Sequence, residues 1–311
     1  MWKTIERSLS IARKRKGNPV HGWVVLDKPY GAGSTSMVGK VRWLYQAQKA
    51  GHAGTLDPLA TGILPIALGE ATKTVPFMMD AEKSYEFTLT WGENTTTQDV
   101  EGEVIATSDV RPDAAAIRAA LPEFRGQIEQ VPPKFSAIKV DGKRAYDLAR
   151  AGEAVELKSR PARIDRFDLV SAEENCASFE VDCGKGTYIR SLARDLAAAL
   201  GACGHVTTLR RTRVGPFNLD GALTLDALEN ICDRGRAEDG LCPVVTALDD
   251  IPALAVTEDD KAFLKQGRAV MLPPNFDYGS SEWVLTMFGE IPIALCTPRG
   301  GQLVPKRVFV I

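Results

Sequence analysis

Residues 51–62 read Gly51-His52-Ala53-Gly54-Thr55-Leu56-Asp57-Pro58-Leu59-Ala60-Thr61-Gly62. Three glycines and a proline in so short a stretch predict a loop with special backbone dihedrals rather than a helix. Pro58 disfavours the helical region for Asp57 and predicts an extended backbone there. Such an Asp either points its carboxylate outward from a stiff turn or caps its own backbone in an Asx turn. The loop by itself favours the Asx turn, so the rest of the chain must decide.

The segments upstream of this loop predict a strand and a helix. Residues 22–29 (GWVVLDKP) are typical of a short buried strand that a proline ends. Ser36 is expected to cap a following helix. The apolar face of that helix would hold Val38, Val41, Leu44 and Tyr45.

Downstream, Ile63–Leu68 is a short apolar run, and residues 85–91 (YEFTLTW) alternate strictly. The alternation predicts a strand with Tyr85, Phe87, Leu89 and Trp91 on one side. Further helices are expected over 113–121, 145–151, 187–200 and 225–232, and further strands over 178–183, 283–287, 292–295 and 304–311, with a turn at Asp141-Gly142.

Helices and mainly alternating strands therefore mix without a regular βαβ rhythm, which favours an α+β fold. With 311 residues the chain is long for a single core. We expect a basic, flexible N-terminal extension over 1–18, a main domain over 19–248 and a small β-rich domain over 249–311.

The composition is that of a soluble globular protein, with 44% hydrophobic and 25% charged residues. No apolar run reaches the length of a membrane span, and the N-terminus lacks the apolar core of a signal peptide. The six cysteines form no C-x-x-C pair and there are three histidines, which argues against a zinc site or a disulfide framework. This cysteine usage fits a reducing cytoplasm.

Charge is distributed unevenly along the chain although the net charge is −2. Residues 1–56 carry ten Lys and Arg against two Asp and Glu, and residues 134–213 carry fifteen against eleven. Residues 57–133 carry five against thirteen. This asymmetry predicts a face that attracts a polyanion.

The usual hydrolase motifs are absent from the sequence. A retaining glycosidase needs a pair of carboxylates, and no second Asp or Glu stands at a turn comparable to that of Asp57. Neither a Gly-x-Ser-x-Gly elbow nor a His-x-x-Glu-His helix occurs.

The stretch GHAGTLDPLATGILPIALGEATK (51–73) resembles the catalytic motif of the bacterial tRNA pseudouridine synthases of the TruB family. The resemblance continues, in the family's order, through LDKP (26–29), KSY (83–85), FSAIKVDGKRAYDLAR (135–150), GKGTYIRSLARDL (184–196) and HVTTLRR (205–211). One departure is the stretch from Pro29 to Ser36, which is two residues longer than the family's P-x-G-x-T-S and places the extra residues near Ala32-Gly33.

The resemblance implies a pseudouridine synthase fold, with a mainly antiparallel mixed sheet flanked by helices and a C-terminal PUA-like RNA-binding domain. It implies isomerisation of uridine at position 55 in the TΨC loop of tRNA, with the target base flipped out of its stack. The reaction involves neither redox chemistry nor hydrolysis, so neither a cofactor nor a metal is expected. Attack on C1′, attack on C6 and elimination through C2′–H all remain open.

The family's catalytic residues fall on three positions of this chain. Asp57 would be the nucleophile. Arg190 would pair with Asp57 and keep it ionised; without the resemblance, Arg190 would be interpreted as a surface helix residue paired with Asp195. Tyr85 would stack on the target base and is a candidate for proton transfer; alone, it would be interpreted as a core residue.

Five further positions match the family's substrate-binding residues. His52 would fill the gap that the flipped base leaves, and Tyr188 and Leu209 would line the uracil pocket. Lys28 and Arg210 would make phosphate or structural contacts. The expected partner is the tRNA T-arm, bound by a monomeric enzyme. The alternatives are a non-catalytic RNA-binding or RNA-folding protein of the same fold, and a synthase for a uridine in another RNA.

Overall fold

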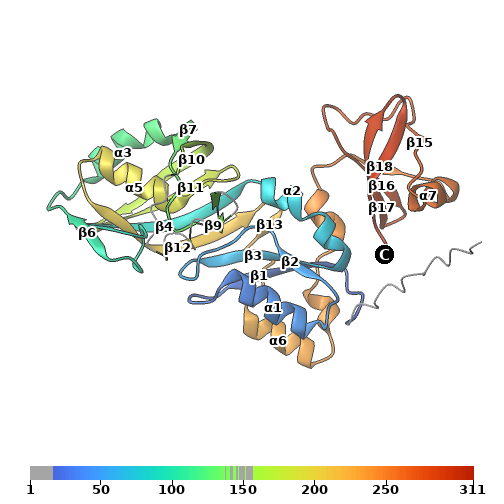
Figure 1. Ribbon diagram of the computed structural model, residues 1–311, viewed down its shortest axis with the longest axis horizontal. Coiled ribbons are helices and arrows are strands. Elements are labelled where there is room, and N and C mark those ends of the chain that lie inside the picture. The colour runs from blue at the N-terminus through green and yellow to red at the C-terminus, as the bar shows by residue number, and fades with distance from the viewer. Residues whose placement is uncertain (1–16, 137, 141–142, 145, 147–150, 152–156) are drawn as a thin grey trace, which may run out of the picture.

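The computed structural model of the chain describes residues 17–136, 138–140, 143–144, 146, 151 and 157–311. The expected N-terminal extension lies almost wholly outside these residues. So do the turn at Asp141-Gly142 and most of the helix expected over 145–151. The described chain forms a large sheet with helices on its faces and a smaller β-rich unit at the C-terminal end (Figure 1).

The large sheet has nine strands and is mainly antiparallel, as the sequence analysis predicted. One pair, β12 with β3, is parallel, and every other pair of its strands is antiparallel. Seven strands follow one another across the sheet in the order β1 (Gly22–Lys28), β3 (Thr61–Leu68), β12 (Gly204–Val214), β4 (Lys83–Trp91), β11 (Cys176–Cys183), β10 (Arg160–Ala172) and β7 (Gly126–Gln130). The remaining two, β2 (Ala50–His52) and β13 (Phe217–Asn218), pair with β3 and β12.

Burial on β4 follows the predicted alternation. Phe87, Leu89 and Trp91 are buried, and Phe87 stacks on Phe179 of β11 with 5.1 Å between the ring centroids. The helices α3 (Ala114–Ala120) and α5 (Ile189–Ala199) cover this side of the sheet and share its apolar cluster.

α5 begins two residues later than the sequence predicted. The turn at Gly184-Lys185-Gly186 continues into an extended Tyr188, with φ −107° and ψ 110°. Gly201 follows the helix with φ +66°, the left-handed conformation that glycine adopts without strain.

The helices α1 (Ser34–Leu44) and α6 (Leu225–Asp233) pack on β1 and β3 in a second apolar cluster. The prediction that Ser36 caps α1 is wrong. The helix begins at Ser34 with Gly33 as its cap, and the Ser36 hydroxyl donates to the Gly33 carbonyl over 2.7 Å from inside the first turn.

Strand β12 was not predicted, although it joins the two halves of the sheet. Its sequence holds three arginines and three threonines, and two register shifts against β4 interrupt its alternation. Periodicity therefore could not reveal it.

The C-terminal unit is a five-stranded sheet with one helix, which confirms the expected β-rich domain. Its strands run in the order β14 (Ala253–Ala255), β16 (Val284–Phe288), β17 (Ile291–Arg299), β18 (Gln302–Val308) and β15 (Val270–Met271), beside α7 (Glu258–Lys265). It contacts the main body directly, because Trp283 meets Phe77 of α2 (Val75–Asp80) edge-on and Lys73 Nζ donates to the Val308 carbonyl over 2.6 Å.

The remaining short elements are the strand pairs β5 (Glu93–Thr95) with β6 (Val104–Thr107) and β8 (Lys139–Val140) with β9 (Lys143–Arg144), and the 3-10 turns η1 (Gly69–Lys73), η2 (Leu121–Phe124), η3 (Ala237–Gly240) and η4 (Val244–Leu248). Within the described chain, none of the helices has the length and apolar character needed to cross a membrane.

Candidate active site

Asp57 lies in the loop that connects β2 to β3. These strands pair antiparallel, with His52 opposite Ile66, so the loop is the end of a hairpin. Gly54 and Gly62 adopt φ +102° and +99°, which confirms the predicted special dihedrals. The carbonyl of Asp57 accepts from the Ala60 amide over 3.1 Å, and this tight turn leaves the carboxylate free to project.

Two buried side chains hold the backbone around Asp57. Lys28 is fully buried, and its ammonium donates to the carbonyls of Pro29, Ala32 and Pro58 over 3.0, 2.7 and 3.1 Å. Ser34 Oγ donates to the Leu56 carbonyl and accepts from the Leu56 amide, over 2.7 and 2.9 Å. The residues on both sides of Asp57 are therefore anchored.

These contacts also answer how the two extra residues near Ala32-Gly33 are accommodated. The loop wraps around the Lys28 ammonium, and the Gly31 amide donates to the Pro58 carbonyl over 2.9 Å. Of the two interpretations of Lys28, the geometry favours the structural one, because backbone carbonyls occupy its ammonium away from solvent. Burial lowers the pKa of Lys28 to about 8, while the nearby Asp57 charge opposes that shift.

Arg190, in the first turn of α5, reaches Asp57 from the other half of the sheet. Its Nη2 lies 2.8 Å from Asp57 Oδ2. The Arg190 side chain is 6% exposed and the Asp57 side chain is 42% exposed, so a buried cation holds a carboxylate that stays open to solvent. The alternative pairing with Asp195 does not occur, because Asp195 pairs with Arg194 over 2.7 Å.

Arg190 has a second carboxylate neighbour that the sequence analysis missed. Asp99 Oδ2 lies 3.3 Å from Arg190 Nη1, and Asp99 is buried. The guanidinium also donates to the carbonyls of Thr97 and Phe135, each over 2.9 Å. Asp99 stands in a polar turn of ordinary composition, and no local signal distinguishes it.

Tyr85 and Tyr188 lie in the neighbourhood of Asp57, whose charge contributes to the pKa of both. Tyr85 is half-buried between the two large apolar clusters, and burial raises its pKa although Arg211 opposes the shift. Burial likewise raises the pKa of Tyr188, and the neighbouring Ser136 opposes the shift. Both phenols are therefore protonated at neutral pH.

His52 ends strand β2 beside this loop. Its Nδ1 is buried and has no hydrogen-bond partner among the residues that the structure describes. Burial lowers the pKa of His52, and the charge of Arg211 lowers it further, so the imidazole is neutral at pH 7.

The last two predicted residues lie on β12, to one side of the Asp57–Arg190 pair. Leu209 packs against both apolar clusters. Arg210 forms a two-pronged ion pair with Asp27, over 3.1 and 2.7 Å. Both residues border a concavity of about 400 Å³ whose lining does not include Asp57 or Arg190. This concavity is thus separate from the ion pair.

Comparison with known proteins identifies the family. Residues 42–189 match the TruB family pseudouridylate synthase (N terminal domain), and residues 190–251 match the tRNA pseudouridylate synthase B C-terminal domain. A protein of Caulobacter sp. (strain K31) named tRNA pseudouridine synthase B is 55% identical, over 96% of this chain and 99% of its own length. The chain belongs to the TruB family. A TruB family protein of Rhizobium meliloti (strain 1021) with the same name is 49% identical, over 97% of this chain and 99% of its own.

Solved structures share the fold of this chain. A chain in the crystal structure of a Cbf5-Nop10-Gar1 complex superposes with a TM-score of 0.74 and 26% identity, covering 93% of this TruB family chain and 85% of its own. A chain in the structure of an H/ACA RNP bound to a substrate RNA containing 2′-deoxyuridine superposes with a TM-score of 0.73 and 23% identity, covering 99% and 94%. The second likeness bears on the fold alone.

The described residues contain no cluster of three or more His, Cys, Asp or Glu side chains arranged to hold a metal ion. The polar groups around Asp57 are an arginine, a lysine bound to carbonyls, two protonated phenols and a neutral imidazole. This set can fix a carboxylate, stack on a flat ring and exchange protons.

Proposed function

We propose that this chain isomerises uridine to pseudouridine at position 55 in the TΨC loop of tRNA, with Asp57 as the nucleophile. Membership of the TruB family supports the reaction, and the relatives named tRNA pseudouridine synthase B support the substrate. The observation that carries the proposal is the Asp57–Arg190 pair, in which a buried guanidinium fixes a carboxylate that stays accessible.

The reaction breaks the N1–C1′ bond and forms a C5–C1′ bond in the same nucleotide. The hydrogen on C5 leaves to solvent and N1 gains a proton, so atoms balance without an oxidant or a water molecule. A carboxylate that attacks the nucleotide divides this change into two easier steps. Arg190 pairs with the carboxylate and aims it, because its planar fork is anchored on two carbonyls and on Asp99.

The aromatic residues around Asp57 suit a base that has left its stack. An extruded base is held by stacking on side chains and by hydrogen bonds to its edge. Tyr85 provides a ring and a protonated phenol, and Tyr188 and Leu209 complete the pocket. A neutral His52 carries no charge into the vacated position, so it can occupy the space of the flipped base among other bases.

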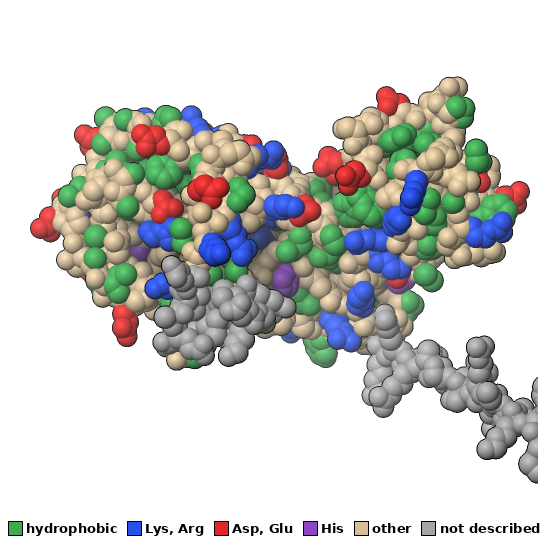
Figure 2. Space-filling view, turned by 45° about the horizontal axis from the view of Figure 1, so that its top comes forward, with side chains coloured by type: hydrophobic (Ala, Val, Ile, Leu, Met, Phe, Trp, Pro, Cys, Tyr) green, Lys and Arg blue, Asp and Glu red, His purple; other side chains and the backbone are tan. Residues whose placement is uncertain are grey.

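The charge distribution supports RNA as the partner. Figure 2 shows Lys and Arg side chains beside the hollow in the middle of this face and on the C-terminal unit. Neutralising phosphates in this way provides much of the affinity of RNA-binding proteins and makes it depend on salt. In our proposal the T-arm lies in the hollow that Figure 2 shows, and the PUA-like C-terminal unit contacts RNA beyond it.

Monomeric action in the cytoplasm belongs to the same proposal. All six cysteines are free, which fits a reducing compartment. Light scattering of the protein with and without tRNA checks the stoichiometry, and a dimer would contradict this part of the proposal.

Tritium release from a tRNA transcript labelled with [5-³H]uridine tests the proposed reaction. We expect release equivalent to a single uridine, and none from a transcript with cytidine at position 55. Release from both transcripts would point to a different uridine. Binding without any release from T-arm substrates would point to a non-catalytic RNA-binding protein and would overturn the proposal.

A further inference from the structure

Arg211 occupies the position where the elements carrying Asp57 and Tyr85 meet. It lies on β12, an interior strand of the large sheet between β3 and β4. On one side it pairs with Gly62, at the start of β3, and on the other with Tyr85 of β4. Its side chain is therefore adjacent both to the Asp57 loop and to the predicted stacking residue.

The Arg211 guanidinium holds the Asp57 loop at both ends. Nε donates to the carbonyl of Ile63 over 2.7 Å, and Nη2 donates to the carbonyl of Gly54 over 3.1 Å. Nη1 makes a longer contact of 3.5 Å with the carbonyl of Thr55. One rigid group thus joins residues before Asp57 to a residue after it.

Two glycines of the loop lie against Arg211, and at Gly62 its approach leaves no room for a side chain. A Cβ on Gly62 would lie 2.1 Å from the Arg211 carbonyl oxygen, so β3 passes directly against the Arg211 backbone. A Cβ on Gly54 would make only an ordinary contact with Arg211, 3.5 Å from Nη1, but φ +102° at Gly54 favours glycine, and its carbonyl accepts from the guanidinium. The loop sequence is therefore adapted to this arginine.

Arg211 is buried without a carboxylate partner. It is 1% exposed, and none of the ion pairs among the described residues includes it. Its neighbours on the same strand each have such a partner, because Arg210 pairs with Asp27 and Arg213 contacts Glu82. Burying an unpaired charge is unfavourable because the charge loses its hydration, and carbonyl dipoles offset only part of this desolvation cost. A residue that served packing alone would not need the charge.

We propose that Arg211 is a positioning residue of the reaction, which fixes the Asp57 loop and Tyr85 in a single geometry. This inference rests on the proposed function. Arg211 does not reach the RNA, since it is buried beneath the loop. It acts through Asp57 and Tyr85, and its positive charge also favours a neutral His52 and opposes the effect of burial on Tyr85.

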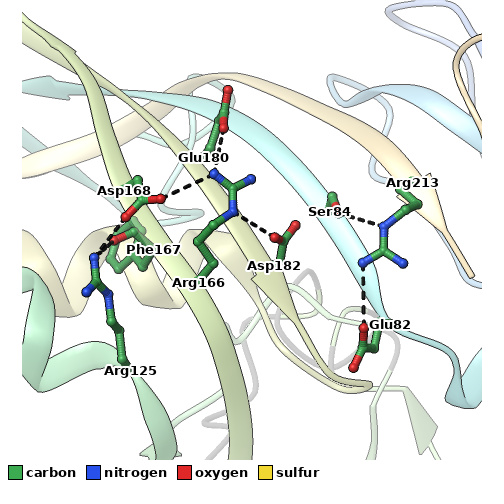
Figure 3. A network of polar contacts seen from close by, with 9 residues as sticks. All are labelled: Glu82, Ser84, Arg125, Arg166, Phe167, Asp168, Glu180, Asp182 and Arg213. Atoms are coloured by element: carbon green, nitrogen blue, oxygen red, sulfur yellow. Dashed lines mark hydrogen bonds and ion pairs between the residues drawn. The ribbon is translucent and has the colours of Figure 1, made fainter.

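The test compares Arg211→Lys and Arg211→Met with Arg213→Lys, a change two residues along the same strand. Arg213 is 37% exposed and belongs to the polar network on the sheet surface, with Ser84 and Glu82 (Figure 3). Lysine keeps the charge of Arg211 but lacks the fork that spans the loop, and methionine keeps much of the volume. Each variant is assayed for the tRNA dissociation constant and for the single-turnover rate of tritium release at saturating enzyme.

We expect both Arg211 variants to bind tRNA within about twofold of the wild type and to react about a hundredfold more slowly, because a small misplacement of reacting groups carries that penalty. Arg213→Lys should match the wild type in both. A rate within about threefold of the wild type in Arg211→Lys and Arg211→Met would overturn the proposal.

A structural role would give a different result. Partial unfolding lowers the amplitude of the single-turnover reaction but not its rate constant, and loss of cooperative thermal unfolding in both Arg211 variants would make Arg211 a folding residue and end the proposal. If the wild type itself releases no tritium from tRNA, the proposed function fails, and this outcome is distinct from failure of the Arg211 variants alone.

Discussion

Arg190 and Arg166 each contact more than one carboxylate, but they do so in opposite surroundings. Arg166 lies on the exposed face of β10, is 42% exposed, and contacts Asp168, Glu180 and Asp182 over 3.3, 2.7 and 2.7 Å (Figure 3). Arg190 is 6% exposed and holds Asp57 and Asp99. The number of acidic partners therefore does not distinguish the site from the surface.

The difference between the two arginines lies in which member of the ion pair is buried. On the surface, burial alone would raise the pKa of Asp182, but hydrogen bonds from Arg166 and Ser84 hold it below the usual value. Exposed pairs of this kind contribute little to stability because water solvates both partners. At the site, the arginine is the buried member, and its partner Asp57 remains accessible. An anchored cation with an open carboxylate is the arrangement that supports chemistry.

Replacing each of the two arginines by lysine tests this comparison, and we expect a large difference in turnover between the two variants. Arg190→Lys should lower the turnover of tRNA at least about a hundredfold while binding stays within about threefold, because lysine lacks the planar fork with which Arg190 reaches two carboxylates and two carbonyls. Arg166→Lys should leave turnover unchanged. Steady-state tritium release measures both, and equal turnover in the two variants would contradict the distinction.

Lys28 offers a second way to sharpen the comparison, because it is a buried cation whose hydrogen-bond partners, among the described residues, are all backbone carbonyls. Its pKa is about 8 in the folded protein, against 10.5 as the reference value. Between these values the unfolded chain binds more protons, so the contribution of Lys28 to stability rises with pH across that window, by up to about 3 kcal/mol.

Urea unfolding of the wild type and Lys28→Met at pH 7 and pH 10 measures this contribution. We expect the wild type to gain stability relative to the variant as the pH increases. If the difference in free energy of unfolding between the two proteins does not change with pH, burial does not lower the pKa of Lys28 and the account is contradicted.

We expect the smallest effect on stability from His52, at acidic pH. Its folded pKa lies below 6.5 because of burial and then Arg211. Below pH 6.5 the unfolded chain binds the proton first, so stability falls as the pH decreases toward the folded pKa. The acid-induced loss of stability should be smaller in His52→Gln. An imidazole NMR titration of His52 with a midpoint above 6.5 would contradict this account.

The fold class was predictable from the pattern of helices and strands in the sequence, whereas the candidate site residues followed only from the resemblance to the TruB family. The strand at 85–91 follows from alternation, and α5 from helical spacing, even though the helix begins at Ile189 rather than Thr187. Asp57 and Arg190 were both predicted as site residues because each lies in a long stretch, 51–73 and 184–196, that resembles the family. Their contact depends on how the two halves of the sheet meet, which spacing alone does not reveal.

Asp99 and Arg211 were missed for a physical reason. Arg211 matters because β12 lies between β3 and β4, and the polar sequence and two register shifts of β12 hide that strand from periodicity. Asp99 acquires its role only through the guanidinium of a helix far along the chain. Such long-range partners emerge from topology. The roles of Tyr85, His52, Tyr188 and Leu209 stay predictions that kinetics must test.

The most direct test of the central claim is the single-turnover release of tritium from [5-³H]uridine-labelled tRNA by Asp57→Asn, with Asp182→Asn as the matched control. Both changes remove one negative charge beside an arginine, but only Asp57 lies at the site. We predict a loss of at least about a thousandfold for Asp57→Asn, with tRNA still bound, and a wild-type rate for Asp182→Asn. Release by Asp57→Asn at more than about a tenth of the wild-type rate would contradict the account.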